Sequence, residues 1–585
     1  MSRGQDWKVE TCPGNHRVLH TSRLPNATVC QLRFRVSFKF PPNPHKTSRS
    51  LLGFIPIFAF SFQTVSTKQH RQTCAFRVLI IPAALPPGNS ISSRLCSLLA
   101  KYLRLGIMAT LSETKTIDPQ QNCLLNKIPV ELLVRITYFI STEDLGNVRL
   151  TCRALERSLF NFFSHEFFRK KQFMVSTFSL QALLDIAKHP AFSRCLKHVV
   201  ISTDRYLRRS THHVQPQVRQ AFNEVCTDHE SLWATGLLRD FLTEAFKNLP
   251  NLETVDIRDF NSRTRNRDGR SLGTAYWSSY GAPSLFRQFS ARPTQDSRSP
   301  EEQLYRSQLF SAVVASLAAA EARPNSIEVI PRSTGLVDSA FFIPARMEPS
   351  ITQVLSGLTK LHLVMEAPYY SQLDMPMAKK FLLLTPQVTW LRLNFFGSPY
   401  NGPINTSEQL PAAFLSWISG TNDDGTPLQN QFPSFHLETL ELGNFSIRPA
   451  HLTRVTTRFA STLRVLGLRR ITLDGRRDNA DDKINIWRKI FTEQLPRVPG
   501  LDLRKIQLAL LRQDHETVVL IDPLTGNQAE ERTYTGEMAK VIQKVGAEIT
   551  PLWPKPSEVV VPDGKSYSYI FYPFSFFQLP KGGRS

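Results

Sequence analysis

Residues 124–168 read LLNKIPVELLVRITYFISTEDLGNVRLTCRALERSLFNFFSHEFF, and this stretch contains three helix patterns in succession. Pro129 predicts the start of the first helix, because proline disfavours helix at the residue before it and fits a first helical turn. Apolar residues then recur at the three- and four-residue spacing of an amphipathic helix: Leu132, Leu133, Ile136, Phe139 and Ile140.

Two further helices are expected directly after the first. The run from Ser141 to Asp144 is similar to a capping box and predicts a second helix that carries Leu145 and Val148. A third helix should run from about Thr151. Its apolar set is Cys152, Leu155, Leu159 and Phe160. Isolated helices of this length are marginal in water, so the three helices need a partner surface.

The same stretch resembles the F-box in the order and spacing of eight residues, which are Ile128, Pro129, Glu131, Ile136, Asp144, Leu145, Arg149 and Cys152. In that family the motif docks onto the Skp-type adaptor of a cullin-RING ubiquitin ligase. The chain differs from the usual pattern at Ile128, where Leu is common, and at Leu155, where Trp is common. The alternative interpretation is a three-helix core segment of an unrelated domain.

The F-box resemblance also implies which residues contact the adaptor. They are Ile128, Pro129, Leu132, Leu133, Ile136, Leu145, Val148 and Cys152.

Length and charge limit the classes of function. With 585 residues the chain is long enough for two or three domains. The formal net charge is +22, of which residues 1–107 contribute +13 and residues 108–585 contribute +9. Because the charge is concentrated upstream, nucleic acid is not expected as a general partner. No cysteine pair has the C-x-x-C spacing of a zinc or redox site, so no metal or cofactor is predicted.

Residues 1–107 are predicted to be a disordered, basic extension, because they are poor in acids, rich in proline and without a sustained helix or strand period. An organelle transit peptide is a second interpretation. Met108 resembles an ordinary start, so we expect the functional chain to begin there, with residues 108–123 as a short leader. The longest apolar run, Leu51 to Phe62, is too short to span a bilayer, and no membrane association is expected.

Downstream of the F-box-like residues 124–168, helices alternate with leucine-rich strands. Residues 179–187 indicate a capped helix and residues 196–201 a strand. The strand pattern L-x-x-L-x-L then recurs at Leu252/Val255/Ile257, Leu358/Leu361/Leu363, Val388/Leu391/Leu393, Leu437/Leu440/Leu442, Leu463/Leu466/Leu468 and Leu503/Ile506/Leu508. This spacing is typical of leucine-rich repeats, in which stacked strands share a core.

The intervals between these strands vary, so the predicted fold class is α+β or α/β, with a small N-terminal three-helix F-box followed by an irregular leucine-rich-repeat-like α/β array. The alternative is an α/β domain whose strands are leucine-rich by chance. We expect the first helix–strand units at residues 169–260, an Arg-rich insertion at 261–303 and the main substrate-binding region at 304–585. Within that region, the aromatic segment Val559 to Pro580 is expected to be a strand that caps the array, and a substrate-docking patch is the alternative.

The insertion at residues 261–303 interleaves arginines with Tyr276, Trp277 and Tyr280. Its arginines are Arg263, Arg265, Arg267, Arg270, Arg287, Arg292 and Arg298. Such a mixture can bind single-stranded nucleic acid, although a solvated loop is the simpler interpretation. The segment 276–283 also resembles a stretch found in fungal F-box proteins.

No phosphate loop, dinucleotide fingerprint, nucleophile elbow or H-E-x-x-H helix occurs, so the sequence gives no reason to propose an enzyme. The resemblance implies a cytoplasmic or nuclear substrate receptor of an SCF-type cullin-RING ubiquitin ligase. Its expected partners are a Skp-type adaptor, a cullin scaffold and an unknown protein substrate. The alternative function is a nucleic-acid-binding α/β repeat protein that uses residues 261–303.

Overall fold

The computed structural model describes residues 128–208, 216–260, 279–290, 299–366, 374–396, 409–422, 424–428, 432–475, 484–514 and 516–553, together with two strands nearer the N-terminus. The chain divides into two compact units, Met1–Leu133 and Val134–Ser585. Each unit is described by itself.

The first unit contains an antiparallel hairpin of β1 (Ala59–Thr67) and β2 (Arg71–Leu79). This hairpin differs from the disorder expected for residues 1–107. The register of the hairpin places Phe62 opposite Phe76. The rest of residues 1–107 and the leader at 108–123 lie outside the described residues.

The three expected helices are present. They are α2 (Val130–Thr137), α3 (Thr142–Thr151) and α4 (Arg153–Phe168). Helix α2 begins directly after Pro129, as its position predicts.

The second unit is built on a ten-stranded sheet with the order β17-β13-β11-β9-β8-β7-β6-β5-β4-β3. Every neighbouring pair from β3 to β13 is parallel. These strands are β3 (Lys170–Met174), β4 (His198–Ser202), β5 (Thr254–Arg258), β6 (Ser326–Val329), β7 (Lys360–Glu366), β8 (Trp390–Phe396), β9 (Thr439–Gly443), β11 (Val465–Arg469) and β13 (Lys505–Ala509). Because parallel strands are added in sequence order, each strand–helix unit packs on the unit before it.

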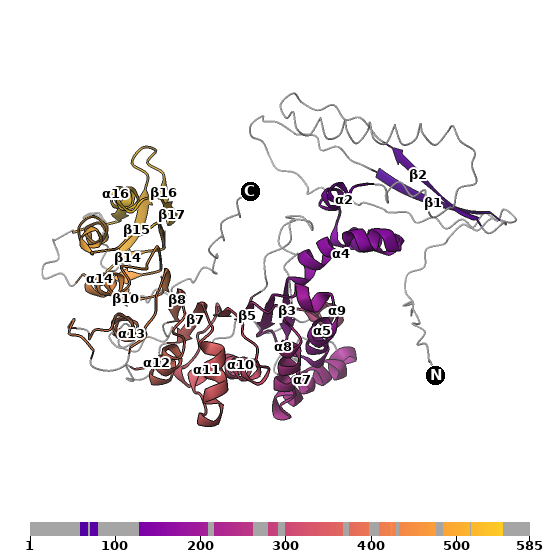
Figure 1. The fold of residues 1–585 in the computed structure, drawn as a ribbon, viewed down its shortest axis with the longest axis horizontal. Coiled ribbons are helices and arrows are strands. Elements are labelled where there is room, and N and C mark those ends of the chain that lie inside the picture. The colour runs from indigo at the N-terminus through magenta and orange to yellow at the C-terminus, as the bar shows by residue number, and fades with distance from the viewer. Residues whose placement is uncertain are drawn as a thin grey trace. The chain divides into compact units, whose positions relative to one another are not determined.

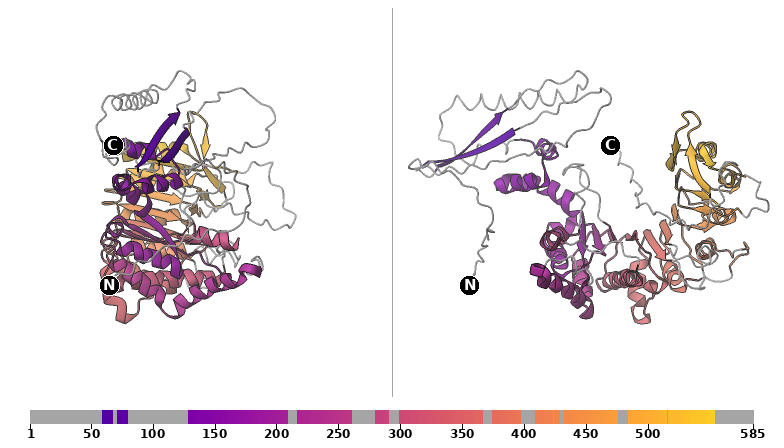
Figure 2. Two further views of the ribbon diagram at one scale, coloured as in Figure 1. Left: turned by 90° about the vertical axis from the view of Figure 1, so that its right-hand side faces the viewer. Right: turned by 180° about the vertical axis from the view of Figure 1, so that it is seen from behind.

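Helices connect these strands and cover one face of the sheet (Figures 1 and 2). They are α5 (Thr177–Lys188), α6 (Phe192–Cys195), η3 (Pro216–Val218), α7 (Arg219–Ala234), α8 (Leu237–Lys247), α9 (Ala282–Phe289), α10 (Pro300–Ala319), η5 (Asp338–Phe341), η6 (Ala345–Met347), α11 (Glu348–Leu355), α12 (Pro376–Leu383), α13 (Gln409–Ser419), α14 (Pro449–Arg458), α15 (Ile486–Lys489), η7 (Ile490–Gln494), η8 (Leu495–Arg497) and α16 (Met538–Glu548). Helix α5 contacts α8, and α8 contacts α10, so neighbouring units also pack through their helices.

The predicted leucine pattern points into the core under these helices. The strand register places one apolar row across the sheet, formed by Val199, Val255, Ile327, Leu361, Leu391, Leu440, Leu466 and Ile506. Each of these side chains is at most 1% exposed. Burial of such a side chain contributes about 1.5–3 kcal/mol. The strands predicted from the leucine pattern are therefore confirmed, and the fold is mixed α/β with mostly parallel strands.

Two strands of the sheet do not have the L-x-x-L-x-L pattern. Strand β6 has Pro324 at the position where the pattern needs its first leucine, and β3 begins with Lys170 and Lys171. Because β6 lies between β5 and β7, it divides the long interval between the strands predicted at Leu252 and Leu358. The strand–helix units are therefore more regular than the sequence pattern indicates.

The last parallel units share one turn conformation. Directly after β9, β11 and β13, the residues Asn444, Arg470 and Leu510 have φ of 58°, 51° and 53°. Each turn leads into a short strand, and these strands pair in sequence order in a second sheet. This sheet contains β10 (Ser446–Ile447), β12 (Thr472–Leu473), β14 (Arg512–Gln513), β15 (Glu516–Ile521), β16 (Gln528–Ala529) and β18 (Ile549–Pro551). The units are thus structural repeats in backbone conformation.

The parallel array ends at β17 (Glu531–Thr535), which pairs antiparallel with β13. Helix α16 packs beside it, and the hydroxyl of Tyr534 donates a 2.8 Å hydrogen bond to Glu548. The edge of β13 is therefore covered by β17. The segment Val559 to Pro580, expected to provide the cap, lies outside the described residues.

Candidate functional site

Two side chains cap helices in the three-helix segment. The Oγ of Ser141 accepts a 3.0 Å hydrogen bond from the Asp144 amide and caps α3, as the capping-box pattern predicts. Cys152 has an extended backbone between α3 and α4, and its Sγ accepts a 3.5 Å hydrogen bond from the Leu155 amide. The third helix therefore begins after Cys152, whose side chain serves as its cap. N-caps of the serine type contribute about 1 kcal/mol.

The eight residues predicted to contact an adaptor differ in exposure. Leu133 and Leu145 are 4% and 0% exposed, so both belong to the protein's own core. The others are half-buried or exposed, namely Ile128, Pro129, Leu132, Ile136, Val148 and Cys152. Only these six residues have side-chain surface that a partner protein could contact.

Other apolar side chains of the segment face solvent. Phe139 is 89% exposed, Leu150 is 86% exposed and Tyr138 is 58% exposed. Large apolar side chains gathered in one segment at such exposure mark interaction surfaces. The sequence pattern does not single out Leu150, because the apolar residues of α3 do not follow one helical face.

An aromatic stack fixes α4 to the parallel array. The Phe192 ring on α6 stacks on Phe168 with centroids 4.1 Å apart, on Phe160 at 5.5 Å and on the His189 ring at 4.3 Å. Aromatic pairs of this geometry contribute about 0.5–1.5 kcal/mol beyond their burial. Helix α4 therefore has a defined position relative to the first strand–helix unit.

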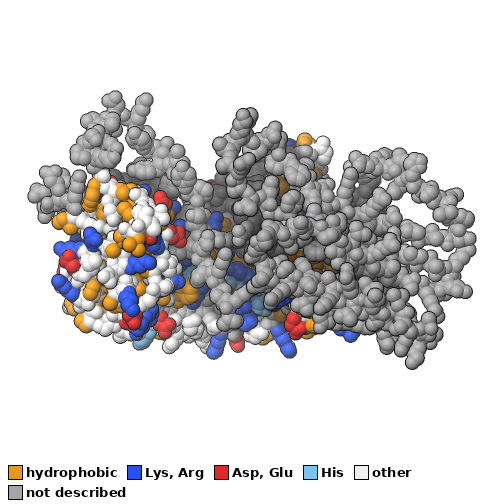
Figure 3. All heavy atoms as spheres, turned by 90° about the horizontal axis from the view of Figure 1, so that it is seen from above, with side chains coloured by type: hydrophobic (Ala, Val, Ile, Leu, Met, Phe, Trp, Pro, Cys, Tyr) orange, Lys and Arg blue, Asp and Glu red, His pale blue; other side chains and the backbone are white. Residues whose placement is uncertain are grey.

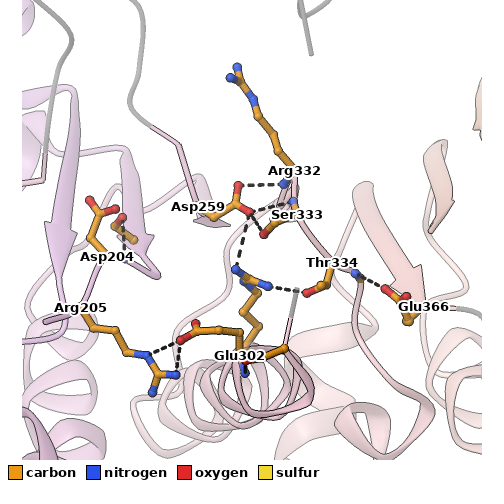
Figure 4. Close-up of polar contacts among 12 residues, drawn as sticks. Asp204, Arg205, Asp259, Glu302, Arg332, Ser333, Thr334 and Glu366 are labelled. Carbon is orange, nitrogen blue, oxygen red and sulfur yellow. Dashed lines mark hydrogen bonds and ion pairs between the residues drawn. The ribbon is translucent and has the colours of Figure 1, made fainter. Parts of the chain in front are cut away.

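A buried polar cluster lies after the carboxyl ends of β5, β6 and β7 (Figure 4). One oxygen of Asp259 accepts a 2.7 Å hydrogen bond from the Arg332 amide, and the other accepts bonds from the amide and hydroxyl of Ser333 at 3.0 and 2.5 Å. Arg306 on α10 is 3.9 Å from the same carboxylate. The Arg332 side chain points away from it (Figure 4). Burial raises the pKa of Asp259, and Arg306 opposes that rise.

The cluster continues on both sides of Asp259. The guanidinium of Arg306 donates to the Thr334 hydroxyl, and the Gly335 amide donates to Glu366 at 2.7 Å. Toward β4, Arg205 donates to Glu302 at 3.1 Å. These bonds join four segments that are distant in the sequence and hold the loops after the strands in place. The donors around Asp259 fit a structural role for that carboxylate.

A charged row crosses the sheet face opposite the leucine core, because alternate residues of a strand point to opposite faces. The register places Asp256 beside Glu328, Glu328 beside His362 and His362 beside Arg392. Burial lowers the pKa of His362 to about 3, so its imidazole is neutral at pH 7.

Three members of this region have a spacing that suits a divalent cation. Ligand atoms of His198, Asp256 and Glu328 lie within 4.8 Å of one another. The two carboxylates already have cationic partners, because Arg258 bonds to Asp256, and Lys360 lies 2.7 Å from Glu328. We therefore assign this group to an ion-pair network.

The Arg-rich insertion predicted at residues 261–303 is described only in part. Its residues 261–278 and 291–298 lie outside the described residues, α9 carries the exposed Arg287, and α10 begins at Pro300. On the face shown in Figure 3, basic, acidic and apolar side chains are interspersed over the described surface. Among the described helices, none combines the length and apolar composition that crossing a bilayer requires.

Neither the protein-family models nor the curated proteins contain a match to this chain. A yeast Rad7–Elc1 complex structure is similar at 11% identity with a TM-score of 0.22, covering 71% of this chain and 92% of that chain. A sugar phosphate isomerase/epimerase from Parabacteroides distasonis is similar at 9% identity with a TM-score of 0.13, covering 58% and 92%.

Proposed function

We infer that this chain is a substrate receptor of an SCF-type cullin-RING ubiquitin ligase. Helices α2, α3 and α4 act as an F-box that binds a Skp-type adaptor on a cullin scaffold. The parallel array acts as a leucine-rich-repeat-like region that binds a protein substrate.

The observation that carries this proposal is the solvent exposure of Phe139 and Leu150, at 89% and 86%, within a helical segment whose residues resemble the F-box. Large apolar side chains that are exposed to water do not stabilise a short helical segment. They contribute free energy only when another surface covers them. An adaptor that docks on the segment would bury this surface.

The array also supports the proposal. Its parallel strands follow sequence order, and the same turn recurs after β9, β11 and β13. On the face opposite the core, Arg392 on β8, Glu441 on β9 and Gln507 on β13 are half-buried, so several strands contribute accessible side chains there, which suits an extended protein ligand.

The proposed mechanism is catalysis by proximity. The Phe168–Phe192 stack holds α4 against α6, so an adaptor on the helical segment and a substrate on the array would have a limited range of separations. Restricting that range raises the effective concentration of substrate lysines near a charged conjugating enzyme. In this mechanism the chain supplies position, and the reacting groups belong to its partners.

The proposal is tested with substitutions on the exposed apolar surface. Phe139→Asp combined with Leu150→Asp should abolish co-purification of the adaptor and the cullin from cells, because two charges would have to be buried at the interface. Leu524→Asp is the matched control, since Leu524 is 94% exposed in the turn between β15 and β16. Leu145→Asp is unsuitable because Leu145 is fully buried and its loss would unfold the segment.

Unchanged adaptor recovery with the double substitution, in a protein whose thermal unfolding matches the wild type, would contradict the proposal. If Leu524→Asp also abolished recovery of the adaptor, the assay would be responding to the loss of any exposed apolar side chain and not to the three-helix segment.

A further inference from the structure

Helix α3 packs on α4, and few of its side chains contribute to this packing. Among the residues of α3, all of which the structure describes, Leu145 is the one that is buried. Arg149 lies four residues later, on the same face of the helix, and its side chain is 15% exposed. The orientation of α3 on α4 therefore depends on few contacts, and Arg149 provides one of them.

The main contact of Arg149 is with an aromatic ring of α4. The central carbon of its guanidinium lies 3.6 Å from the ring centroid of Phe163. A terminal nitrogen lies 3.7 Å from the carboxylate of Glu156, whose side chain is 51% exposed. Within the described part of the chain, the Nε of Arg149 is buried and makes no hydrogen bond. A solvent-exposed ion pair contributes little, whereas a cation over an aromatic ring contributes more when water is excluded, so the contact with Phe163 is the stronger of the two.

The Phe163 ring is itself held in place by neighbouring rings. It stacks on Phe167, which is 6% exposed, with centroids 4.7 Å apart. It also contacts Phe168, with centroids 5.8 Å apart, and Phe168 stacks on Phe192 of the parallel array. A continuous line of contacts thus leads from Arg149 to the first strand–helix unit.

Arg149 is directly followed by Leu150, which is 86% exposed. Successive residues of an α-helix are about 100° apart around its axis, so the direction of Leu150 follows from the side of the helix that Arg149 occupies. A helix held by Leu145 alone would pivot about that side chain. A second contact one turn later prevents this motion, and Leu150 keeps one direction relative to α4.

We propose that Arg149 is a positioning residue for the adaptor-binding surface, in which its contact with Phe163 fixes α3 on α4 and holds Leu150 in the orientation that the adaptor binds. The inference rests on the proposed receptor function, because it concerns how that surface is formed. The adaptor contacts Leu150, and Arg149 acts through Leu150.

Two other roles for Arg149 predict different results. If Arg149 contacted the adaptor directly, its contribution to binding would be independent of Leu150. If it acted through its ion pair, Glu156 would be as important for binding as Arg149. Substitutions at these three positions therefore separate the roles.

The test uses the full chain and a purified Skp-type adaptor, with the dissociation constant measured by isothermal titration calorimetry. Arg149→Ala should weaken binding about tenfold, and Leu150→Ala should weaken it at least as much. In the double variant the loss should be close to that of Leu150→Ala alone, because Arg149 acts through Leu150. Losses that multiply in the double variant would overturn the positioning role.

Three further variants identify the contact that matters. Glu156→Gln should change the dissociation constant by less than about twofold. Arg149→Lys keeps the charge but not the planar guanidinium, so it should restore only part of the affinity that Arg149→Ala loses. Arg239→Ala removes an exposed arginine of α8 and should leave binding unchanged. Equal losses in Glu156→Gln and Arg149→Ala would overturn the assignment to Phe163.

Amide hydrogen exchange shows whether α3 stays helical in Arg149→Ala. If the helix is lost, Phe163→Leu decides the question, because it removes the ring and keeps an apolar side chain; unchanged adaptor binding in that variant would overturn the proposal. If Phe139→Asp with Leu150→Asp abolishes adaptor binding while Arg149→Ala binds normally, the positioning role fails alone. If none of these substitutions affects adaptor binding, the proposed receptor function fails as well.

Discussion

The rings of Phe168 and Phe192 stack with centroids 4.1 Å apart and planes inclined by 10°. Phe168 ends helix α4, and Phe192 begins the short helix α6 of the first strand–helix unit. This contact joins the three-helix segment to the parallel array, so its strength determines whether the two move together.

Phe192→Ala should loosen that connection. The substitution removes the ring that stacks on Phe160, Phe168 and His189, and we expect a loss of about 1–3 kcal/mol in the free energy of unfolding, since Phe192 is only half-buried. Amide hydrogen exchange should accelerate in α4 more than in β7. Phe342→Ala is the control, because Phe342 is 59% exposed, and it should change stability by less than about 0.5 kcal/mol.

Two glycines should respond to alanine in opposite directions. A Cβ at Gly335 would lie 2.2 Å from the Met365 carbonyl carbon, so Gly335→Ala should destabilise the protein by more than about 2 kcal/mol. A Cβ at Gly146 within α3 would meet nothing within 4 Å, so Gly146→Ala should stabilise α3 by about 0.5–1 kcal/mol. Urea unfolding of both variants measures the difference, and similar effects would contradict the described packing.

Glu328 should make the protein sensitive to acid. Burial disfavours the charged carboxylate, but the Lys360 ammonium, 2.7 Å away, lowers its pKa below the ordinary value of 4.5. His362 is neutral above about pH 3 and adds to this effect only when it is protonated. A carboxyl whose folded pKa is lowered stabilises the fold above pH 4.5, and this contribution is lost as the pH falls toward the folded pKa.

Glu328→Gln should therefore cost about 1–3 kcal/mol at pH 7 and flatten the loss of stability below pH 4.5. Urea unfolding at several pH values provides the measurement. Glu438→Gln, at an exposed carboxylate, should leave both the stability and its pH dependence unchanged.

The sequence predicts the helices and strands that depend on interactions between residues close together in the chain. Ser141 caps α3 because its hydroxyl is three residues from the amide that it accepts, and the leucine pattern identifies strands because their alternate residues enter the core. The same reasoning misses β6, whose first pattern position is occupied by Pro324. The F-box resemblance places Leu133 and Leu145 among the adaptor contacts, whereas the structure buries both side chains.

The amino-acid sequence by itself thus determined three short helices, one of them capped by Ser141, and a succession of strands with one apolar face. Only the tertiary structure decided which distant side chains meet. Lys170, Asp256 and Glu328 come together because β3, β5 and β6 lie in one parallel sheet with a fixed register, although their positions in the chain are far apart. Local periodicity carries no information about that register, which depends on how each strand–helix unit packs on the unit before it.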